Sequence, residues 1–494
     1  MRATAEKNSM QIKTEVFDVL IINGEVFDGS GNVSIKQDIA IKGDKIVKLG
    51  DLKAYDALEV IDAQGLIVAP GFIDVHTHDD LEVIRNPRML NKISQGVTSV
   101  IIGNCGISAS PYSCETAPVD PINLLGKQEE FAFAQLSDYI QKFNTVRPHI
   151  NVAALVGHTS LRAQVMKRLD EAASDSEIKQ MATLLNLALS QGAKGLSTGL
   201  AYHNANAAPE SEVQALVDTL ADYNAIYSTH LRTEFDGIIG ALDEAFNVGK
   251  QGNVPVVISH LKCAGKNNWG RANEVLEHIS HAREDQKVCC DCYPYNASSS
   301  TLDLTQVTED FDIFITWSKP HSEKSAQTLA AIAKQWQVSL MEAAKRLQPA
   351  GAVYHGMLEG DVRQIMQATY SMIGSDGLPC DPHPHPRLWG TFPRVLGHYS
   401  RDQHVLGLSQ AIHKMTGLSA TEFTLKHRGF IREGYFADLV IFDAKTIQDM
   451  ASFTEPFAIS QGIKKVWVNG QLTYEEGKGP AENEGAGRFL AHKK

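Results

Sequence analysis

Short apolar segments alternate with helical segments through the middle of this chain, and this alternation restricts the fold more than any other feature. We count eight candidate strands, at 72–75, 99–102, 151–156, 194–197, 225–228, 254–259, 287–292 and 371–374. Helical patterns such as 175–190 and 212–223 lie between most of them. This order is typical of parallel β/α architecture, and eight parallel strands close a barrel. The sequence therefore predicts an α/β protein built on a (β/α)8 barrel.

The two ends of the chain have a different pattern, because short apolar strands flank turn signals such as Asn23-Gly24 and Asn469-Gly470. We expect residues 1–69 and 420–480 to meet as one small β-sandwich domain, with two unrelated β appendages as the alternative. The barrel then spans 70–419, and 481–494 form a C-terminal tail. About 80 residues separate the last two barrel strands, too many for one connecting helix. We predict a helical insertion near 305–350.

Composition narrows the class of protein. The chain has 494 residues, 43% apolar and 21% charged, which is ordinary for a globular enzyme or binding protein. Its formal net charge of −12 argues against nucleic-acid and membrane partners. The first 15 residues lack the apolar core of a secretory signal, and seven irregularly spaced cysteines do not form a disulfide framework. We expect a cytoplasmic protein with a small-molecule partner, and the sequence leaves its oligomeric state open.

Polar residues gather where the predicted strands end. In a (β/α)8 barrel these C-terminal ends share one rim, which carries the active site. His76 and His78 are two residues apart at the end of the first strand and so face the same side. Imidazole, thiolate and carboxylate groups are the ligands that zinc prefers. The sequence predicts a metal site formed by six residues: His76, His78, Cys105, His230, His260 and Asp376.

Each candidate has an alternative. Cys105 taken alone is compatible with a small buried hydrophobe, and the cysteines of 289–292 face opposite ways along a strand and fit the core. Lys194 is a possible bridging ligand, but it precedes the functional end of its strand by roughly 13 Å at the rise of a strand. His158 also lies on the rim, either as a packing residue or as a substrate contact.

Motifs along nearly the whole chain resemble one family. They are PGFIDVHTHDD at 70–80, GNCGIS at 103–108, GLSTGL at 195–200, THLRTE at 229–234, ISHLK at 258–262, YPY at 293–295, GSDGLP at 374–379, RLWGTFPRVLG at 387–397 and IREGYFADLV at 431–440. The chain resembles the N-acyl-D-amino-acid deacylases, or D-aminoacylases, of the amidohydrolase superfamily. The resemblance implies a metal-dependent (β/α)8 barrel plus a β-sandwich formed by both chain ends.

The resemblance also implies roles for the site residues. One zinc ion would be bound tightly by Cys105, His230 and His260. A second, weaker metal position would use His76, His78 and Asp376 and share the cysteine. The substrate carboxylate would be held by Lys262, Tyr293, Ser299 and Arg387, and an arginine fork suits a carboxylate best.

The implied reaction is zinc-dependent hydrolysis of a linear amide C–N bond, which splits an N-acyl-D-amino acid into a carboxylic acid and a free D-amino acid. Asp376 would be the catalytic base and then the acid that protonates the leaving nitrogen. A D-residue dipeptidase, or another cyclic or linear amidohydrolase, is the alternative. A non-enzymatic scaffold is disfavoured because no ligand or acid/base group is missing.

One loop departs from the family pattern. Tyr202 is followed by His203-Asn-Ala-Asn, where the family often has a Pro-Gly turn. That loop should border the substrate, so the preferred acyl group and D-side chain are open, with a broad or apolar side-chain preference favoured. The number of bound metal ions is also open.

Overall fold

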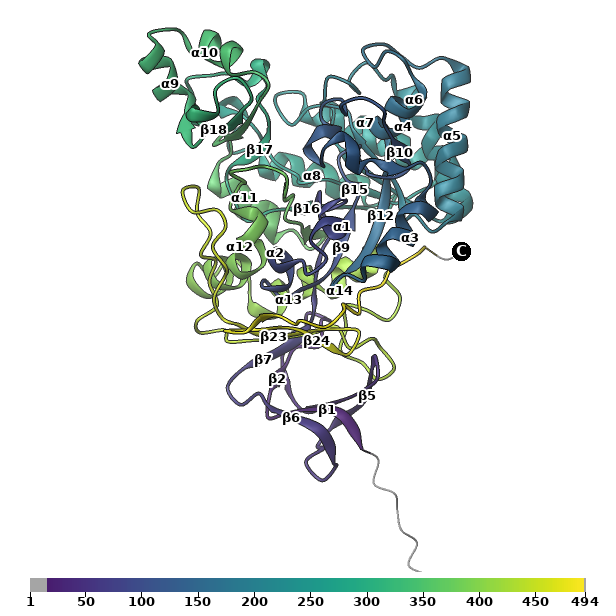
Figure 1. The fold of residues 1–494 in the computed structure, drawn as a ribbon, viewed down its shortest axis with the longest axis vertical. Coiled ribbons are helices and arrows are strands. Elements are labelled where there is room, and N and C mark those ends of the chain that lie inside the picture. The colour runs from purple at the N-terminus through teal and green to yellow at the C-terminus, as the bar shows by residue number, and fades with distance from the viewer. Residues whose placement is uncertain (1–15, 493–494) are drawn as a thin grey trace, which may run out of the picture.

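The computed structural model of the protein describes residues 16–492, so predictions for 1–15 and 493–494 lie outside the described residues. Its centre is an eight-stranded parallel sheet in the order β8-β9-β12-β13-β14-β15-β16-β21 (Figure 1). The strands are β8 (Phe72–Asp74), β9 (Val97–Ile102), β12 (Asn151–Gly157), β13 (Gly195–Gly199), β14 (Ile226–His230), β15 (Val256–Ile258), β16 (Val288–Cys292) and β21 (Ser371–Ile373). The predicted (β/α)8 barrel is confirmed.

The first and last barrel strands meet just beyond their C-terminal ends. Thr77 and Gly377 form a parallel bridge, and the amide of Asp376 donates to the carbonyl of His76 over 2.7 Å. The amide of His78 donates to the carbonyl of Gly377 over 3.1 Å. The seam that closes the barrel therefore passes directly through three of the predicted metal ligands.

Helices cover the outside of the barrel because their apolar faces pack on its buried strands. The helix predicted at 175–190 is α5 (Asp175–Ser190), which Ser174 and Glu177 begin with a capping box. The other helices around the barrel are α1 (Glu82–Arg85), α2 (Leu90–Ile93), α3 (Leu136–Val146), α4 (His158–Val165), α6 (Glu210–Val217), α7 (Ile238–Gln251), α8 (Ala272–Ala282), α11 (Glu359–Gln367), α12 (Arg387–Arg394), α13 (Leu408–Met415) and α14 (Gly417–Glu422).

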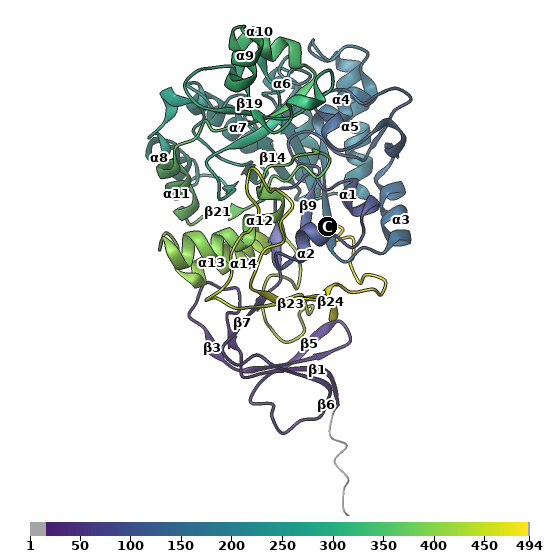
Figure 2. The same ribbon diagram turned by 60° about the vertical axis from the view of Figure 1, so that its left-hand side comes forward.

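Both chain ends form one β-sandwich below the barrel, as predicted (Figure 2). One sheet contains β5 (Lys45–Gly50), β4 (Asp38–Lys42), β1 (Phe17–Ile22) and β6 (Ala57–Asp62). The other contains β25 (Gly479–Pro480), β24 (Gln471–Glu475), β23 (Ile463–Val468), β22 (Leu439–Phe442), β7 (Ile67–Pro70), β2 (Glu25–Val26) and β3 (Ile35–Lys36). Ile41, Val68 and Trp467 are buried in one core between the sheets, so the two ends are not separate appendages. β7 ends the sandwich strand at Pro70 and β8 begins the barrel at Phe72, so the chain passes from one to the other at these residues.

The insertion is mixed rather than helical, which corrects the prediction for 305–350. It contains an antiparallel sheet of β17 (Ser298–Thr301), β20 (Ala350–Tyr354), β18 (Ile313–Ser318) and β19 (Gln327–Thr328), with α9 (Leu329–Trp336) and α10 (Leu340–Leu347). Ile315, Leu329 and Ala352 belong to its own apolar core. The β-branched and aromatic run in β18 favours a strand, and a prediction based on the length of the gap overlooked it.

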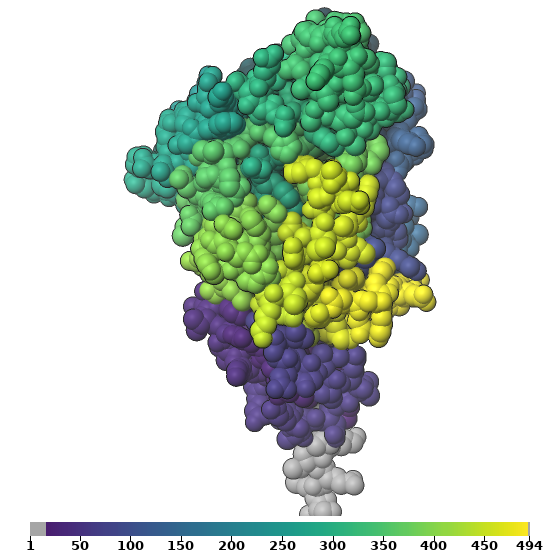
Figure 3. Space-filling model, turned by 90° about the vertical axis from the view of Figure 1, so that its left-hand side faces the viewer, coloured from purple at the N-terminus to yellow at the C-terminus, as the bar shows by residue number. Residues whose placement is uncertain are grey.

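The C-terminal tail lies along the start of β12. Phe489 bridges Val152, and the amide of Leu490 donates to the carbonyl of Val152 over 2.6 Å. A second C-terminal segment, 449–461, runs from the sandwich over the barrel towards the insertion (Figure 3). There the carbonyl of Phe453 lies 2.7 Å from His383 Nε2. Among residues 16–492, no helix is both long and apolar enough to cross a membrane.

Candidate metal and substrate site

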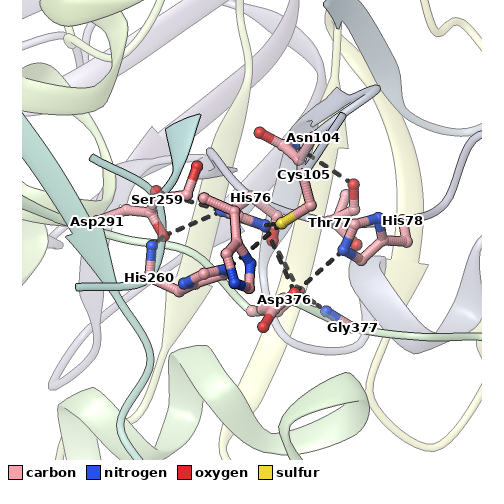
Figure 4. A network of polar contacts seen from close by, with 12 residues as sticks. His76, Thr77, His78, Asn104, Cys105, Ser259, His260, Asp291, Asp376 and Gly377 are labelled. Atoms are coloured by element: carbon pink, nitrogen blue, oxygen red, sulfur yellow. Dashed lines mark hydrogen bonds and ion pairs between the residues drawn. The ribbon is translucent and has the colours of Figure 1, made fainter. Parts of the chain in front are cut away.

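The six predicted metal ligands converge on one sulfur atom. Ligand atoms of His76, His78, Cys105 and Asp376 all lie within 4.8 Å of one another, and the same holds for Cys105, His230 and His260. Cys105 Sγ lies 3.2 Å from His76 Nε2 and 3.3 Å from His260 Nε2 (Figure 4). The structure therefore brings together every residue that the strand-end rule selected, in two groups that share the thiol.

Asp376 faces both the histidines and the cavity. Its Oδ1 lies 3.1 Å from His78 Nε2 and 3.4 Å from His76 Nε2 (Figure 4). Its Oδ2 lies 2.9 Å from Arg387 Nη1. One carboxylate thus links the predicted metal ligands to a buried cation.

Three of the site residues have strained backbones. Cys105, His260 and Asp376 have φ angles of +53°, +35° and +48°, in the left-handed region that side chains disfavour. Such residues cost about 1–3 kcal/mol each and persist where the surrounding structure holds them. Each follows the end of a barrel strand, so the unusual turn directs a donor group inward. Three of the six proposed metal ligands therefore have this backbone conformation.

Two carboxylates that the sequence analysis missed orient these ligands. Asp291 lies 3.3 Å from His76 Nδ1 through Oδ2, and its Oδ1 accepts from the amide of His260 over 3.0 Å (Figure 4). Glu234 Oε1 lies 3.0 Å from His260 Nδ1. Carboxylates that hold the second ring nitrogen of a histidine ligand fix its tautomer and orientation. Two features of the sequence could have indicated these residues. Asp291 is an acidic residue inside the apolar strand 287–292, and Glu234 is the glutamate that ends the THLRTE motif.

The donor chemistry fits zinc. Burial opposes ionisation of Cys105, but His76 and His260 hold the pKa of its thiol well below the usual range. The thiolate is the form that binds metals. With two imidazoles beside it, this sulfur forms the kind of three-ligand set that leaves a fourth position on zinc open.

Three of the four predicted substrate residues line a cavity of about 740 Å³ at the barrel mouth, together with His230, His260 and Asp376. These three are Lys262, Tyr293 and Ser299. Arg387 lies behind them, 1% exposed, with its guanidinium 4.6 Å from the centre of the Tyr293 ring. Its Nη2 donates to the carbonyl of Ser299 over 3.3 Å, while Nε has no hydrogen-bond partner among residues 16–492.

The structure separates the remaining candidates from this site. Lys194 Nζ donates to the carbonyl of Thr424, at the end of the barrel away from the site, so it is not a bridging ligand. His158 is fully buried with Nε2 2.9 Å from Glu212, which fits the packing alternative. The cysteines of β16 are buried, and neither group of potential metal ligands found in the described part of the chain includes them.

Known proteins are similar to the chain over nearly its whole length. The profile of the amidohydrolase family matches residues 59–474. Three proteins of Alcaligenes xylosoxydans xylosoxydans are each 44% identical to the chain. The N-acyl-D-aspartate deacylase covers 95% of this chain and 94% of its own length, the D-aminoacylase 97% and 99%, and the N-acyl-D-glutamate deacylase 94% and 94%.

The chain belongs to the amidohydrolase family, among its N-acyl-D-amino-acid deacylases.

Solved structures of this branch agree with the amidohydrolase fold described above. The crystal structure of a D-aminoacylase has a TM-score of 0.94 and 44% identity, covering 96% of this chain and all of that one. An N-acyl-D-glutamate deacylase from Bordetella bronchiseptica, complexed with zinc and a phosphonate inhibitor that mimics the tetrahedral intermediate, has a TM-score of 0.93 and 41% identity. That match covers 97% of this amidohydrolase and all of the Bordetella bronchiseptica chain.

Proposed function

We propose that this amidohydrolase hydrolyses the amide bond of N-acyl-D-amino acids and releases a carboxylic acid and a free D-amino acid. The observation that carries the proposal is one cavity lined by His230, His260 and Asp376 with Lys262 beside them. The names of the three relatives support both the amide bond and the D-configuration.

Zinc is the proposed cofactor. Cys105, His230 and His260 would hold the tightly bound ion, and His76, His78 and Asp376 would form the weaker second position with the shared cysteine. The zinc complex of the Bordetella bronchiseptica deacylase supports this choice of metal. When bound, zinc supplies a Lewis acid that polarises the amide carbonyl and makes water a better nucleophile.

The chain's own residues position the substrate by its α-carboxylate. Lys262, Tyr293 and Ser299 line the cavity, and the guanidinium of Arg387 lies against the Tyr293 ring. The partnerless Nε of Arg387 is a buried donor, and a buried donor without an acceptor is costly. A substrate carboxylate that reaches this guanidinium would remove that cost, which favours substrates that carry a free carboxylate.

Asp376 then moves the proton. Burial opposes its ionisation, but Arg387 and His76 keep its pKa well below the usual range, so the group is an ionised acceptor. Its Oδ1 faces the histidines, so Oδ2 takes the proton from the attacking water. The same oxygen returns the proton to the amide nitrogen, because an amine leaves poorly unless it is protonated.

The test is hydrolysis of paired N-acetyl-D- and N-acetyl-L-amino acids by zinc-loaded protein, measured as release of free amino acid. We expect turnover of D-substrates and little of their L-enantiomers. Dipeptides with a C-terminal D-residue, run in parallel, test the dipeptidase alternative. Faster cleavage of those dipeptides, or no cleavage of any N-acetyl-D-amino acid, would contradict the proposal.

We also propose a cytoplasmic location. All seven cysteines are free in the structure, which supports a reducing compartment. Cell fractionation against cytoplasmic and periplasmic markers measures this directly, and recovery with the periplasmic marker would overturn it.

A further inference from the structure

We propose that this deacylase selects N-acyl-D-amino acids with an uncharged side chain and rejects those with a second carboxylate, such as D-aspartate and D-glutamate. This inference rests on the proposed function and specifies its substrate class. Sequence identity does not decide the question, because the N-acyl-D-aspartate deacylase, the N-acyl-D-glutamate deacylase and the D-aminoacylase are each 44% identical to the chain. The charges around the cavity distinguish these substrate classes.

The basic side chains at the cavity already have acidic partners. Lys262 Nζ donates to Glu234 Oε1 over 2.5 Å, and Arg387 Nη1 lies 2.9 Å from Asp376 Oδ2. These two cations are the ones proposed to hold the α-carboxylate. Binding one substrate carboxylate therefore uses the available positive charge on that side of the cavity.

Arg232 is the arginine that lines the cavity itself, and the protein already engages it. Its guanidinium forms a two-point ion pair with Glu244, with Nη2 2.6 Å and Nε 2.8 Å from the carboxylate oxygens. Its Nη1 donates to the carbonyl of Asn206 over 2.9 Å, and Nη2 also donates to the carbonyl of Ala208 over 3.0 Å. These bonds use four of the five N–H groups, so Arg232 fixes the loop after Tyr202 and has no pair of free donors for a carboxylate.

The cavity also has an acidic wall, formed by residues that are not among the proposed metal ligands. Asp120 and Asp303 both line the cavity, and the one histidine on that wall, His203, is exposed. Burial raises the pKa of Asp120, His203 and Thr301 lower it, and Asp303 raises it by a smaller effect. The two carboxylates therefore interact with each other. A third carboxylate beside them would lose water and meet two like charges, with only the exposed His203 as a cation on this wall, which is unfavourable.

The segment that forms this wall contains no basic residue. From 298 to 318 the sequence is SSSTLDLTQVTEDFDIFITWS, in which the charged residues are all acidic. Its contribution to the cavity is mainly hydroxyl, amide and aliphatic, from residues 298–306. Such a surface solvates an apolar or hydrogen-bonding D-side chain, and nothing in it neutralises a carboxylate.

Two pairs of nearly isosteric substrates test the inference with zinc-loaded wild-type protein. They are N-acetyl-D-glutamate against N-acetyl-D-glutamine, and N-acetyl-D-aspartate against N-acetyl-D-asparagine, with N-acetyl-D-leucine as a reference. We expect kcat/KM to favour the amide of each pair at least ~100-fold. An acid hydrolysed as well as its amide, while N-acetyl-D-leucine is turned over, overturns this inference alone. Failure of all five substrates overturns the proposed function.

A neutral replacement on the acidic wall provides the second measurement. Asp303 accepts from the amide and the hydroxyl of Thr305, both over 2.8 Å, and asparagine retains an acceptor for this turn. We expect Asp303→Asn to reduce the preference for glutamine over glutamate by about tenfold. Asp310→Asn is the matched control, because Asp310 lies on the same segment but outside the cavity, paired with Lys266. An unchanged preference in folded Asp303→Asn protein, or an equal change in the control, would contradict the role of the acidic wall.

Discussion

Glu234 links the proposed metal site to the proposed carboxylate site, and replacing it with glutamine separates their contributions. Its side chain is buried, with Oε1 3.0 Å from His260 Nδ1 and 2.5 Å from Lys262 Nζ. When His260 binds a cation through Nε2, Nδ1 carries the proton and donates to Glu234. The same oxygen balances the charge of Lys262. Glutamine keeps the size and one acceptor but removes the negative charge.

The expected magnitude follows from these two contacts. Loss of a carboxylate behind a histidine ligand typically reduces metal affinity or activity by about 10–100-fold. Loss of the partner of a buried ammonium group costs about 2–5 kcal/mol until another anion replaces it. The substrate carboxylate is such an anion, so it should bind Lys262 at least as well in the variant. We expect Glu234→Gln to lower zinc affinity and kcat about 10–100-fold without raising KM.

Zinc affinity is measured by competition with a chromophoric chelator, and kcat and KM at saturating zinc with N-acetyl-D-leucine. Glu244→Gln is the matched control, because Glu244 forms a similar ion pair with Arg232, Nη2 to Oε1 2.6 Å, without contacting a metal ligand. Zinc affinity should be unchanged in that control. Zinc affinity and kcat within twofold of wild type in Glu234→Gln, or a KM increase as the main effect, would refute the reasoning.

The remaining predictions concern proton transfer by Asp376, recognition of the substrate carboxylate by Arg387 and the buried Lys194. Asp376→Asn should retain the zinc held by Cys105, His230 and His260 but lose at least ~1000-fold in kcat. Metal analysis and turnover measure the two effects, and undiminished turnover would remove the aspartate from the mechanism. Arg387→Met should lower kcat/KM by ~100-fold on N-acetyl-D-leucine but little on its C-terminal amide, and equal losses on both would contradict the carboxylate contact. Burial, with a smaller effect from Lys426, lowers the pKa of Lys194 to about 8. The folded state therefore binds fewer protons than the unfolded state between about pH 8 and 10.5. Below pH 8 the buried charge lowers the stability of the fold by roughly 3 kcal/mol, and this loss disappears as the pH rises through that range. Lys194→Met should therefore stabilise the protein by about 1–2 kcal/mol at pH 7, after loss of the hydrogen bond to Thr424, and not at pH 10.5; denaturant unfolding at both pH values measures the difference, and an equal effect at both would contradict it.

The metal ligands could be predicted from the sequence because the architecture brings them together. Parallel strands have their C-terminal ends at one rim, so the polar residue that ends each strand was sufficient to select His230 and His260. The strand rise also excluded Lys194, whose side chain contacts Thr424 away from the site. These predictions needed only the strand positions and not the contacts between side chains.

Other parts of the site depend on contacts that no local pattern encodes. Asp291 belongs to a strand whose cysteines fit the core, and only its distances to His76 and His260 reveal its function as an orienting group. The left-handed backbone at Cys105 is equally hidden, because the sequence gives no reason for a non-glycine residue to adopt it there. The insertion was mispredicted for a related reason, since the length of the gap says nothing about the strands inside it.

The ion pair between Arg387 and Asp376 connects substrate recognition to proton transfer. The same guanidinium that is proposed to hold the substrate carboxylate lies 2.9 Å from the oxygen proposed to accept the proton. A substrate carboxylate gives Arg387 a second acceptor and weakens its hold on Asp376, which makes the aspartate a stronger base. A substrate without a carboxylate leaves the pair intact. Removing the carboxylate from a substrate should therefore lower kcat as well as raise KM, and a change confined to KM would show that the two functions of Arg387 are independent.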